Sequence, residues 1–142
     1  MAAQPMSVPN EPPTEIKALI AQVFGAFNSK DSVLYNSAFT ADAVVIDGIA
    51  PYRWIGPNAP ARWFSDAEQW VHELGVMNEN IACDRIIHAS VVGVHAYVVL
   101  SATLSFNLKG GQTGVRPGIL TFTFGKQGDK WKVESQAWGR LS

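Results

Sequence analysis

Asp47 is the residue of this 142-residue sequence that is best placed to transfer a proton. It follows Val44, Val45 and Ile46 and precedes Gly48, so we expect it at the end of a buried strand that opens on a cavity. An apolar pocket raises the pKa of a carboxylic acid because burial disfavours the charged form, and the carboxylate then becomes a competent base near neutral pH. The alternative is an Asx turn, in which the side chain only accepts hydrogen bonds from nearby backbone amides.

Arg85 and Tyr52 are the residues that could stabilise negative charge as it develops on a substrate. Strand alternation places Arg85 on one face together with Cys83 and Ile87. If that face is the inner one, Arg85 is a buried cation that needs a partner, and Asp47 is the candidate. The pair would bind a polar or anionic ligand group, but it would also lower the pKa of Asp47 and weaken it as a base. The alternative is a surface arginine that pairs with a neighbouring acid.

Large apolar side chains supply the walls that a ligand pocket needs. The residues predicted to line such a pocket are Trp54, Trp63, Leu120, Phe122 and Trp138. For Trp63 we favour a packing role, since a helix on a sheet needs large core side chains. Phe122, Phe124 and Trp138 are also bulky enough to fill the cavity, which would leave no room for a ligand.

Several other kinds of site are not predicted. Eleven Lys and Arg against twelve Asp and Glu give a formal charge of −1, which provides no electrostatic basis for binding nucleic acid or an anionic membrane. The single cysteine, Cys83, excludes an internal disulfide and a cysteine-built zinc site. His88 and His95 could face each other across a hairpin, but without a carboxylate at ligand spacing they do not make a metal site. We therefore expect no metal and no cofactor.

The elements that must position these residues follow from the apolar pattern. Apolar residues recur at helical spacing from Ile16 to Phe27, a short second helix can start at Asp31, and a third can start at Asn58. Short buried strands are predicted at residues 43–46 and 52–55. Turns that contain glycine separate the later β-rich runs, which is typical of antiparallel hairpins; these runs are 81–92, 94–108, 115–124 and 130–141.

This order indicates an α+β domain with three N-terminal helices packed on the concave face of a curved, mostly antiparallel sheet. A pocket between such helices and such a sheet favours apolar ligands. Residues 14–142 are predicted to form this one domain. Residues 1–13 contain four prolines and lack the features of a signal peptide, so we expect a flexible leader on a cytoplasmic protein. No segment is apolar and long enough to predict a membrane span.

The outer face of the predicted sheet carries no charge along residues 94–108. Apolar residues such as Val98 and Leu100 alternate there with neutral polar residues such as Ser101 and Thr103. A large uncharged face suits contact with a second copy of the chain better than exposure to water. We therefore predict a homodimer formed through the outer sheet face.

The segment from Asp42 to Asp47, followed by Trp54-Ile55-Gly56-Pro57 and then a helix, resembles the nuclear-transport-factor-2-like superfamily. Within it, the chain is similar to SnoaL-like and ketosteroid-isomerase-like proteins. The resemblance covers roughly residues 14–141 and implies a cone-shaped, cystatin-like fold. It also implies dimerisation through the outer sheet face, with ligands or catalysis inside the cone.

The resemblance can be compared with ketosteroid isomerase chemistry, which needs a carboxylate base together with a Tyr and a protonated Asp as hydrogen-bond donors. Asp47 matches the base, at the end of the first strand. Val23 and Leu120 stand where the two donors would be. The resemblance therefore does not imply a ketosteroid isomerase.

These observations predict a domain that binds a small, apolar, ring-bearing molecule and could isomerise, cyclise or dehydrate it by proton transfer. Asp47 would move the proton, while Tyr52 or Arg85 would stabilise negative charge. One alternative is a non-catalytic binding module that uses the same cavity. The other is a structural dimerisation domain whose cavity is filled.

Overall fold

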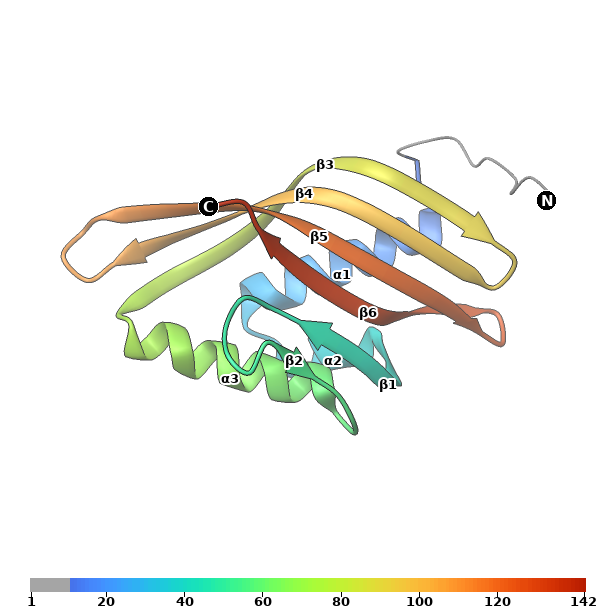
Figure 1. Ribbon diagram of the computed structural model, residues 1–142, viewed down its shortest axis with the longest axis horizontal. Coiled ribbons are helices and arrows are strands. Elements are labelled where there is room, and N and C mark those ends of the chain that lie inside the picture. Colours follow the sequence, from blue (N-terminus) through green and yellow to red (C-terminus); the bar gives the residue numbers. More distant parts are fainter. Residues whose placement is uncertain (1–10) are drawn as a thin grey trace.

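Three helices lie against the concave face of one six-stranded sheet (Figure 1). The computed structural model describes residues 11–142, and the leader predicted at residues 1–13 lies, up to residue 10, outside the described residues. The helices are α1 (Thr14–Ser29), α2 (Ser32–Ser37) and α3 (Ala59–Glu73). The strands are β1 (Phe39–Ile46), β2 (Arg53–Trp54), β3 (Val76–Val92), β4 (His95–Leu108), β5 (Thr113–Gln127) and β6 (Lys130–Arg140).

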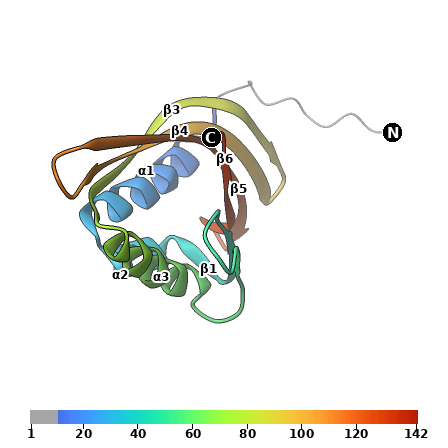
Figure 2. The same cartoon turned by 60° about the vertical axis from the view of Figure 1, so that its left-hand side comes forward.

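The sheet has the strand order β2-β1-β6-β5-β4-β3. Strand β1 runs parallel to β6, and every other neighbouring pair is antiparallel. The long strands β3, β4 and β5 curl around α1, as Figure 2 shows. The predicted α+β fold, with helices on a curved and mostly antiparallel sheet, is confirmed.

The helices begin and end where local chemistry favours it. In α1, Ile16 and Val23 are buried on the face that meets the sheet, and the helix ends at Lys30, whose φ of 63° turns the chain away. Asp31 begins α2, because its side chain accepts a hydrogen bond from the backbone N–H of Leu34. None of the helices within residues 11–142 has both the length and the apolar character of a membrane span.

Strand β3 begins at Val76, earlier than the predicted start at residue 81. Val76 pairs with Leu108 at the far end of β4, and the register shifts between Met77 and Asn80. Asn78 lies in this irregular stretch with a φ of 57°. The start of β3 was not predicted because its residues are mostly polar and a bulge interrupts the alternation of apolar residues.

The core fills the space between the helices and the inner sheet face. Alternation in β4 follows the prediction, since Val98 and Leu100 are buried there, whereas Val99 and Ser101 lie on the other face. The residues that are fully buried in this core include Tyr35, Leu100, Phe122, Phe124 and Val133. The end of the core that lies away from the β5–β6 turn is hollow, and the candidate site lies there.

Candidate active site inside the cone

A cavity of about 360 Å³ lies between the helices and the inner face of the sheet. Its size falls within the range of about 300–1,000 Å³ that is typical of small-molecule sites. Most of its wall is apolar, with contributions from α1, α3 and the four long strands. Besides the indoles of Trp63, Trp70 and Trp138, the residues with polar side chains in this wall are Tyr35, Asp47, Arg116, Gln136, Arg140 and Ser142.

Asp47 lines the cavity immediately after the end of β1. Its Oδ2 accepts a hydrogen bond from Nε1 of Trp63 at 2.7 Å, and its Oδ1 accepts one from the backbone N–H of Gly48 at 2.6 Å. Burial raises the pKa of Asp47, and these two hydrogen bonds lower it by less. The cavity position and the bond to the next backbone amide, which the sequence offered as alternatives, therefore occur together.

Trp63 holds the Asp47 carboxylate from the opposite wall, on α3. Its indole stacks on Phe27 of α1 with ring centroids 6.2 Å apart and lies 5.4 Å from the ring of Tyr35. The indole thus packs against two other helices while its N–H donates to the carboxylate. Trp63 is thus both the packing residue that we favoured and a wall of the cavity.

Tyr35 and Gln136 form a second polar pair in the wall, which the sequence analysis missed. The Tyr35 hydroxyl is buried and donates a hydrogen bond to Oε1 of Gln136 at 3.0 Å. Burial raises the pKa of Tyr35, so the hydroxyl remains a donor at physiological pH. Gln136 lines the cavity, and its amide Nε2 donates to no residue in the described part of the chain.

Trp138 and Leu120 line the cavity as predicted, opposite each other on β6 and β5. The Trp138 indole lies across Gly118, where an added Cβ would overlap the six-membered ring. The missing side chain of Gly118 therefore lets the indole lie flat against the sheet and leaves the cavity open. Strand alternation from Trp138 also points to Gln136, two residues earlier on β6, as an inward-facing residue.

The predicted place of Arg85 in the site is wrong. Arg85 is exposed, pairs with Ser101 on the outer face of β4, and does not line the cavity. A bulge between Cys83 and Arg85 inserts Asp84, so Cys83 still faces inward opposite Ala102 while Arg85 does not. The predicted ion pair between Arg85 and Asp47 does not form.

Three other predicted site residues lie outside the cavity. Tyr52 is 60% exposed, in the loop before β2, with a φ of 73°. Trp54 is buried, but its Nε1 donates to Oδ2 of Asp66 at 2.8 Å, behind the cavity wall. Phe122 is buried deeper in the core and stacks on Phe124 at 5.8 Å. For Trp54 and Phe122 the aromatic type was a correct sign of core position, but not of the cavity.

Val23 and Leu120, the positions compared with the donors of ketosteroid isomerase, both line the cavity. Neither can donate a hydrogen bond, so that donor pair is missing from the wall itself. Within residues 11–142, no three His, Cys, Asp or Glu side chains gather in a way that could hold a metal ion.

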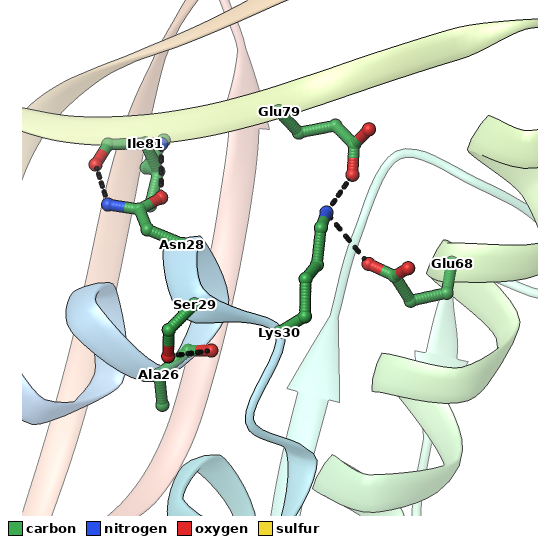
Figure 3. A network of polar contacts seen from close by, with 7 residues as sticks. All are labelled: Ala26, Asn28, Ser29, Lys30, Glu68, Glu79 and Ile81. Carbon is green, nitrogen blue, oxygen red and sulfur yellow. Dashed lines mark hydrogen bonds and ion pairs between the residues drawn. The ribbon is translucent and has the colours of Figure 1, made fainter.

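A network of polar contacts fixes the wall where α1, α3 and β3 meet (Figure 3). Lys30 forms ion pairs with Glu79, which is buried on β3, and with Glu68 on α3 at 3.0 Å. The Asn28 amide group bonds both ways to the backbone of Ile81, donating to its oxygen at 3.0 Å and accepting from its N–H at 2.8 Å. Because Ile81 lines the cavity, these contacts hold that part of the wall in place.

Solved structures share this fold at low sequence identity. A hexachlorocyclohexane dehydrochlorinase of Novosphingobium barchaimii is 13% identical with a TM-score of 0.76, covering 90% of this chain and 85% of that chain. A nuclear-transport-factor-2-like superfamily protein of Salmonella enterica is 14% identical with a TM-score of 0.73, covering 90% and 89%. A nuclear-transport-factor-2-like protein with a cystatin-like fold from Novosphingobium aromaticivorans is 18% identical with a TM-score of 0.73, covering 90% and 80%.

These likenesses establish the fold. Comparison with curated proteins gave no match. The family model of the SnoaL-like domain matches residues 16–137, which span all three helices and nearly the whole sheet. The chain therefore belongs to the SnoaL-like domain family.

Proposed function

We propose that this domain binds a small, apolar, ring-bearing molecule in its cavity and acts on it by proton transfer, with Asp47 as the base. The observation that carries the proposal is the position of Asp47, the one Asp or Glu side chain that lines the cavity within residues 11–142. Isomerisation, cyclisation and dehydration all fit, because a positioned side chain can move the proton in each of them.

The state of the Asp47 carboxyl group supports its role as a base. Burial raises its pKa, which brings its basicity closer to that of a useful catalyst near neutral pH. Each of its oxygens accepts one hydrogen bond, from Gly48 or from Trp63, and so keeps a lone pair that can take a proton. The fixed donors also hold the carboxylate in one orientation toward the cavity.

Gln136 supports the same proposal from β6, the strand next to β1. Its Nε2 can donate to an oxygen that becomes negative when a neighbouring carbon loses a proton. The Tyr35 hydroxyl fixes this orientation by donating to Oε1. Gln136 would then supply, from β6, the hydrogen bond to the substrate oxygen that the side chains of Val23 and Leu120 cannot donate.

One structural neighbour supports the substrate class. The dehydrochlorinase of Novosphingobium barchaimii is named for hexachlorocyclohexane, a small apolar ring. Its fold matches that of this chain, so the fold is able to enclose such a molecule. The apolar wall of the cavity supports the same class here.

A non-catalytic binding module is the second candidate function. It is favoured by the two hydrogen bonds to Asp47, which satisfy the carboxylate without any ligand. The alternative of a filled cavity is not favoured, since about 360 Å³ remains open.

The test combines a binding screen with a measurement of proton exchange. Small aromatic and polyketide-like compounds are first screened by thermal shift, because a ligand of the native state raises its stability. Compounds that bind are then incubated with the protein in D₂O, and mass spectrometry detects deuterium that enters at carbon. The variants are Asp47→Asn and, as the matched control, Asp66→Asn, whose carboxylate also accepts from a Trp indole but lies outside the cavity.

Asp47→Asn should lower the exchange rate by about 10²–10⁴-fold while binding is retained, and Asp66→Asn should leave the exchange unchanged. Unchanged exchange in Asp47→Asn would remove this residue from the mechanism. Binding without exchange in the wild-type protein, for every compound that binds, would favour the binding module.

A further inference from the structure

Two arginines without an acidic partner stand in the wall of the cavity. Arg116 on β5 and Arg140 at the end of β6 both line it, and both are exposed to solvent. Within residues 11–142, neither side chain forms an ion pair with an Asp or Glu. Residues 1–10 contain no Asp or Glu that could supply one. Two cations therefore remain uncompensated by acidic side chains at the mouth of the cavity.

The sheet register places these two arginines side by side on the inner face. Arg140 pairs with Gly118, and Arg116 lies two residues before Gly118 on the same strand. Diagonal neighbours of this kind have Cα atoms about 7–8 Å apart, which long side chains can bridge. One negatively charged group between them could therefore contact both guanidinium groups.

Local contacts hold each arginine but leave donors unused. The Arg116 guanidinium lies 5.8 Å from the centre of the Phe106 ring, and its Nη1 donates only to the neighbouring Val115 oxygen at 3.4 Å. The aliphatic part of the Arg140 side chain lies against Gly48, and its Nε donates to the main-chain oxygen of Ser142 at 3.2 Å. No other hydrogen bond of either side chain forms within the described residues. An arginine has five N–H donors, so both can still bind an oxyanion.

The charges inside the cavity favour an anion at this end. Among the described residues of the wall, the charged side chains are two guanidinium groups and the carboxyl group of Asp47, whose pKa burial raises. The main chain of Ser142, whose oxygen accepts a hydrogen bond from Nε of Arg140, belongs to the same wall. Trp63 and Gly48 hold the Asp47 carboxylate, and it forms no ion pair with either arginine. The remaining wall is mostly apolar, so a wholly polar anion would lose more hydration than the cavity returns.

We propose that the cavity selects an amphiphilic ligand, with an apolar ring body inside and one oxyanion group, such as a carboxylate, sulfonate or phosphate, bound by Arg116 and Arg140 at the mouth. This inference rests on the proposed function in one respect, that the cavity takes an apolar body. It adds the charged group and the end of the cavity at which that group lies.

Two fluorescent probes with the same ring system separate the charge from the apolar body. 8-Anilinonaphthalene-1-sulfonate carries a sulfonate, and N-phenyl-1-naphthylamine is the same skeleton without it. The dissociation constants of both are measured for the wild type, for the double variant Arg116→Gln/Arg140→Gln, and for Arg85→Gln. Arg85 is the matched control, because it is an exposed arginine on the outer sheet face.

The wild type should bind the sulfonate probe about tenfold more tightly than the neutral probe, a preference that weakens with added salt. The double variant should lose this preference and keep its affinity for the neutral probe, while Arg85→Gln changes neither. Equal affinities in the wild type, or an equal loss in Arg85→Gln, would overturn the proposal. Competition by 2-naphthoate and 2-naphthyl phosphate beyond that of neutral 2-naphthamide supports the oxyanion site, and equal competition by all three contradicts it.

Variants that fill the cavity separate this proposal from the proposed function. Leu120→Trp and Ala67→Phe each place a larger side chain in the wall, and circular dichroism identifies those that fold. If a folded filling variant binds the neutral probe as well as the wild type does, no apolar body enters the cavity and the proposed function fails. If filling abolishes neutral-probe binding but the sulfonate brings no advantage, the arginine site alone fails.

Discussion

Nε1 of Trp63 lies 2.7 Å from Oδ2 of Asp47. The Trp63 side chain therefore forms part of the cavity wall and also influences the ionisation of the Asp47 carboxyl group. Burial raises the pKa of Asp47, and the indole N–H is the larger of the two hydrogen-bond effects that lower it. The balance between these opposing effects determines the pH at which Asp47 becomes a base.

Trp63→Phe should raise the pKa of Asp47 further, because it removes the indole donor and keeps an aromatic wall. The measurement is a ¹³C NMR titration of the Asp47 carboxyl carbon, which needs no substrate. The matched control is Trp54→Phe, since Trp54 donates in the same way to Asp66 outside the cavity. A titration of Asp47 that does not move in Trp63→Phe, or that moves as far in Trp54→Phe, would contradict the prediction.

The same shift has a consequence for stability. The folded-state pKa of Asp47 is raised above the ordinary value of 3.8, so the folded protein binds this proton more tightly than the unfolded chain does. Its contribution to stability is therefore present below pH 3.8 and is lost as the pH rises through the folded-state pKa. In Trp63→Phe this loss should extend to higher pH, which unfolding curves measured at several pH values would show.

Gly118→Ala should reduce ligand binding, because the new methyl group would overlap the Trp138 indole and push it away from the sheet. The displaced ring would enter the cavity and take up space that the ligand needs. Burying a large apolar side chain is worth about 1.5–3 kcal/mol, so the affinity for N-phenyl-1-naphthylamine should fall by about tenfold or more. Fluorescence titration measures this affinity.

Gly25→Ala is the control for Gly118→Ala. Gly25 lies within α1, and an added Cβ there would meet no atom within 4 Å. Alanine should therefore stabilise the helix by about 0.5–1 kcal/mol and leave binding unchanged. Equal binding by both glycine variants would show that the position of Trp138 does not control the cavity.

The fold could be predicted from the sequence because its signals are repeated many times along the chain. The helical spacing from Ile16 to Phe27 and the alternation around Val98 and Leu100 each rest on several residues, so one irregular position does not change the conclusion. In contrast, the face of the sheet on which a single site residue lies depends on the local register alone, so one irregular position changes it. One bulged residue, Asp84, moved Arg85 to the outer face, and the sequence around it contains no glycine or proline to mark the bulge.

The Tyr35–Gln136 pair could not be predicted for a different reason. The two residues are 101 positions apart in the sequence. They meet only because β6 pairs with β1 and α2 packs against β1. The parallel pairing of β1 with β6 is itself a tertiary feature that local periodicity does not encode. Asp47 could be predicted because its evidence, an acidic residue after a run of β-branched residues, is entirely local.

Glu79→Gln should destabilise the protein more than Glu68→Gln, although both glutamates bind Lys30. The Glu79 side chain is 5% exposed and that of Glu68 is 40% exposed, so only Glu79 pairs with Lys30 in a largely dry environment. The expected losses are about 1–3 kcal/mol for Glu79→Gln and within about 1 kcal/mol for Glu68→Gln. Urea unfolding measures both, and equal losses would contradict the prediction.

Because of Lys30, the stability that this network contributes should be lost at alkaline pH and not at acid pH. Burial acts to lower the pKa of Lys30, but its hydrogen bonds to Glu79 and Glu68 and the attraction of their negative charges together outweigh burial and raise the pKa above 10.5. The contribution of the network to stability is therefore complete below pH 10.5 and is lost as the pH rises through the raised value. Glu79→Gln should reduce the loss of stability that the wild type shows in this alkaline range.

The homodimer predicted through the outer sheet face can be tested at its centre. Strands β4 and β5 present uncharged outer side chains there, in which Val99 pairs with Thr121 and Ser101 pairs with Ile119. Arg85 of β3 lies next to them, opposite Ser101. A two-fold contact brings each substitution into the interface twice. Val99→Asp should therefore bury two like charges and raise the dimer dissociation constant by at least about 100-fold, which corresponds to about 2.7 kcal/mol.

Val33→Asp is the control, because Val33 is 79% exposed and belongs to α2, a helix on the concave side of the sheet (Figure 1). Light scattering after size-exclusion chromatography gives the mass of each variant in solution. A wild-type mass equal to one chain of 15.4 kDa would contradict the predicted dimer. A dimer that survives Val99→Asp would place the contact elsewhere on the surface, because two aspartates cannot be buried against each other without a large loss of affinity.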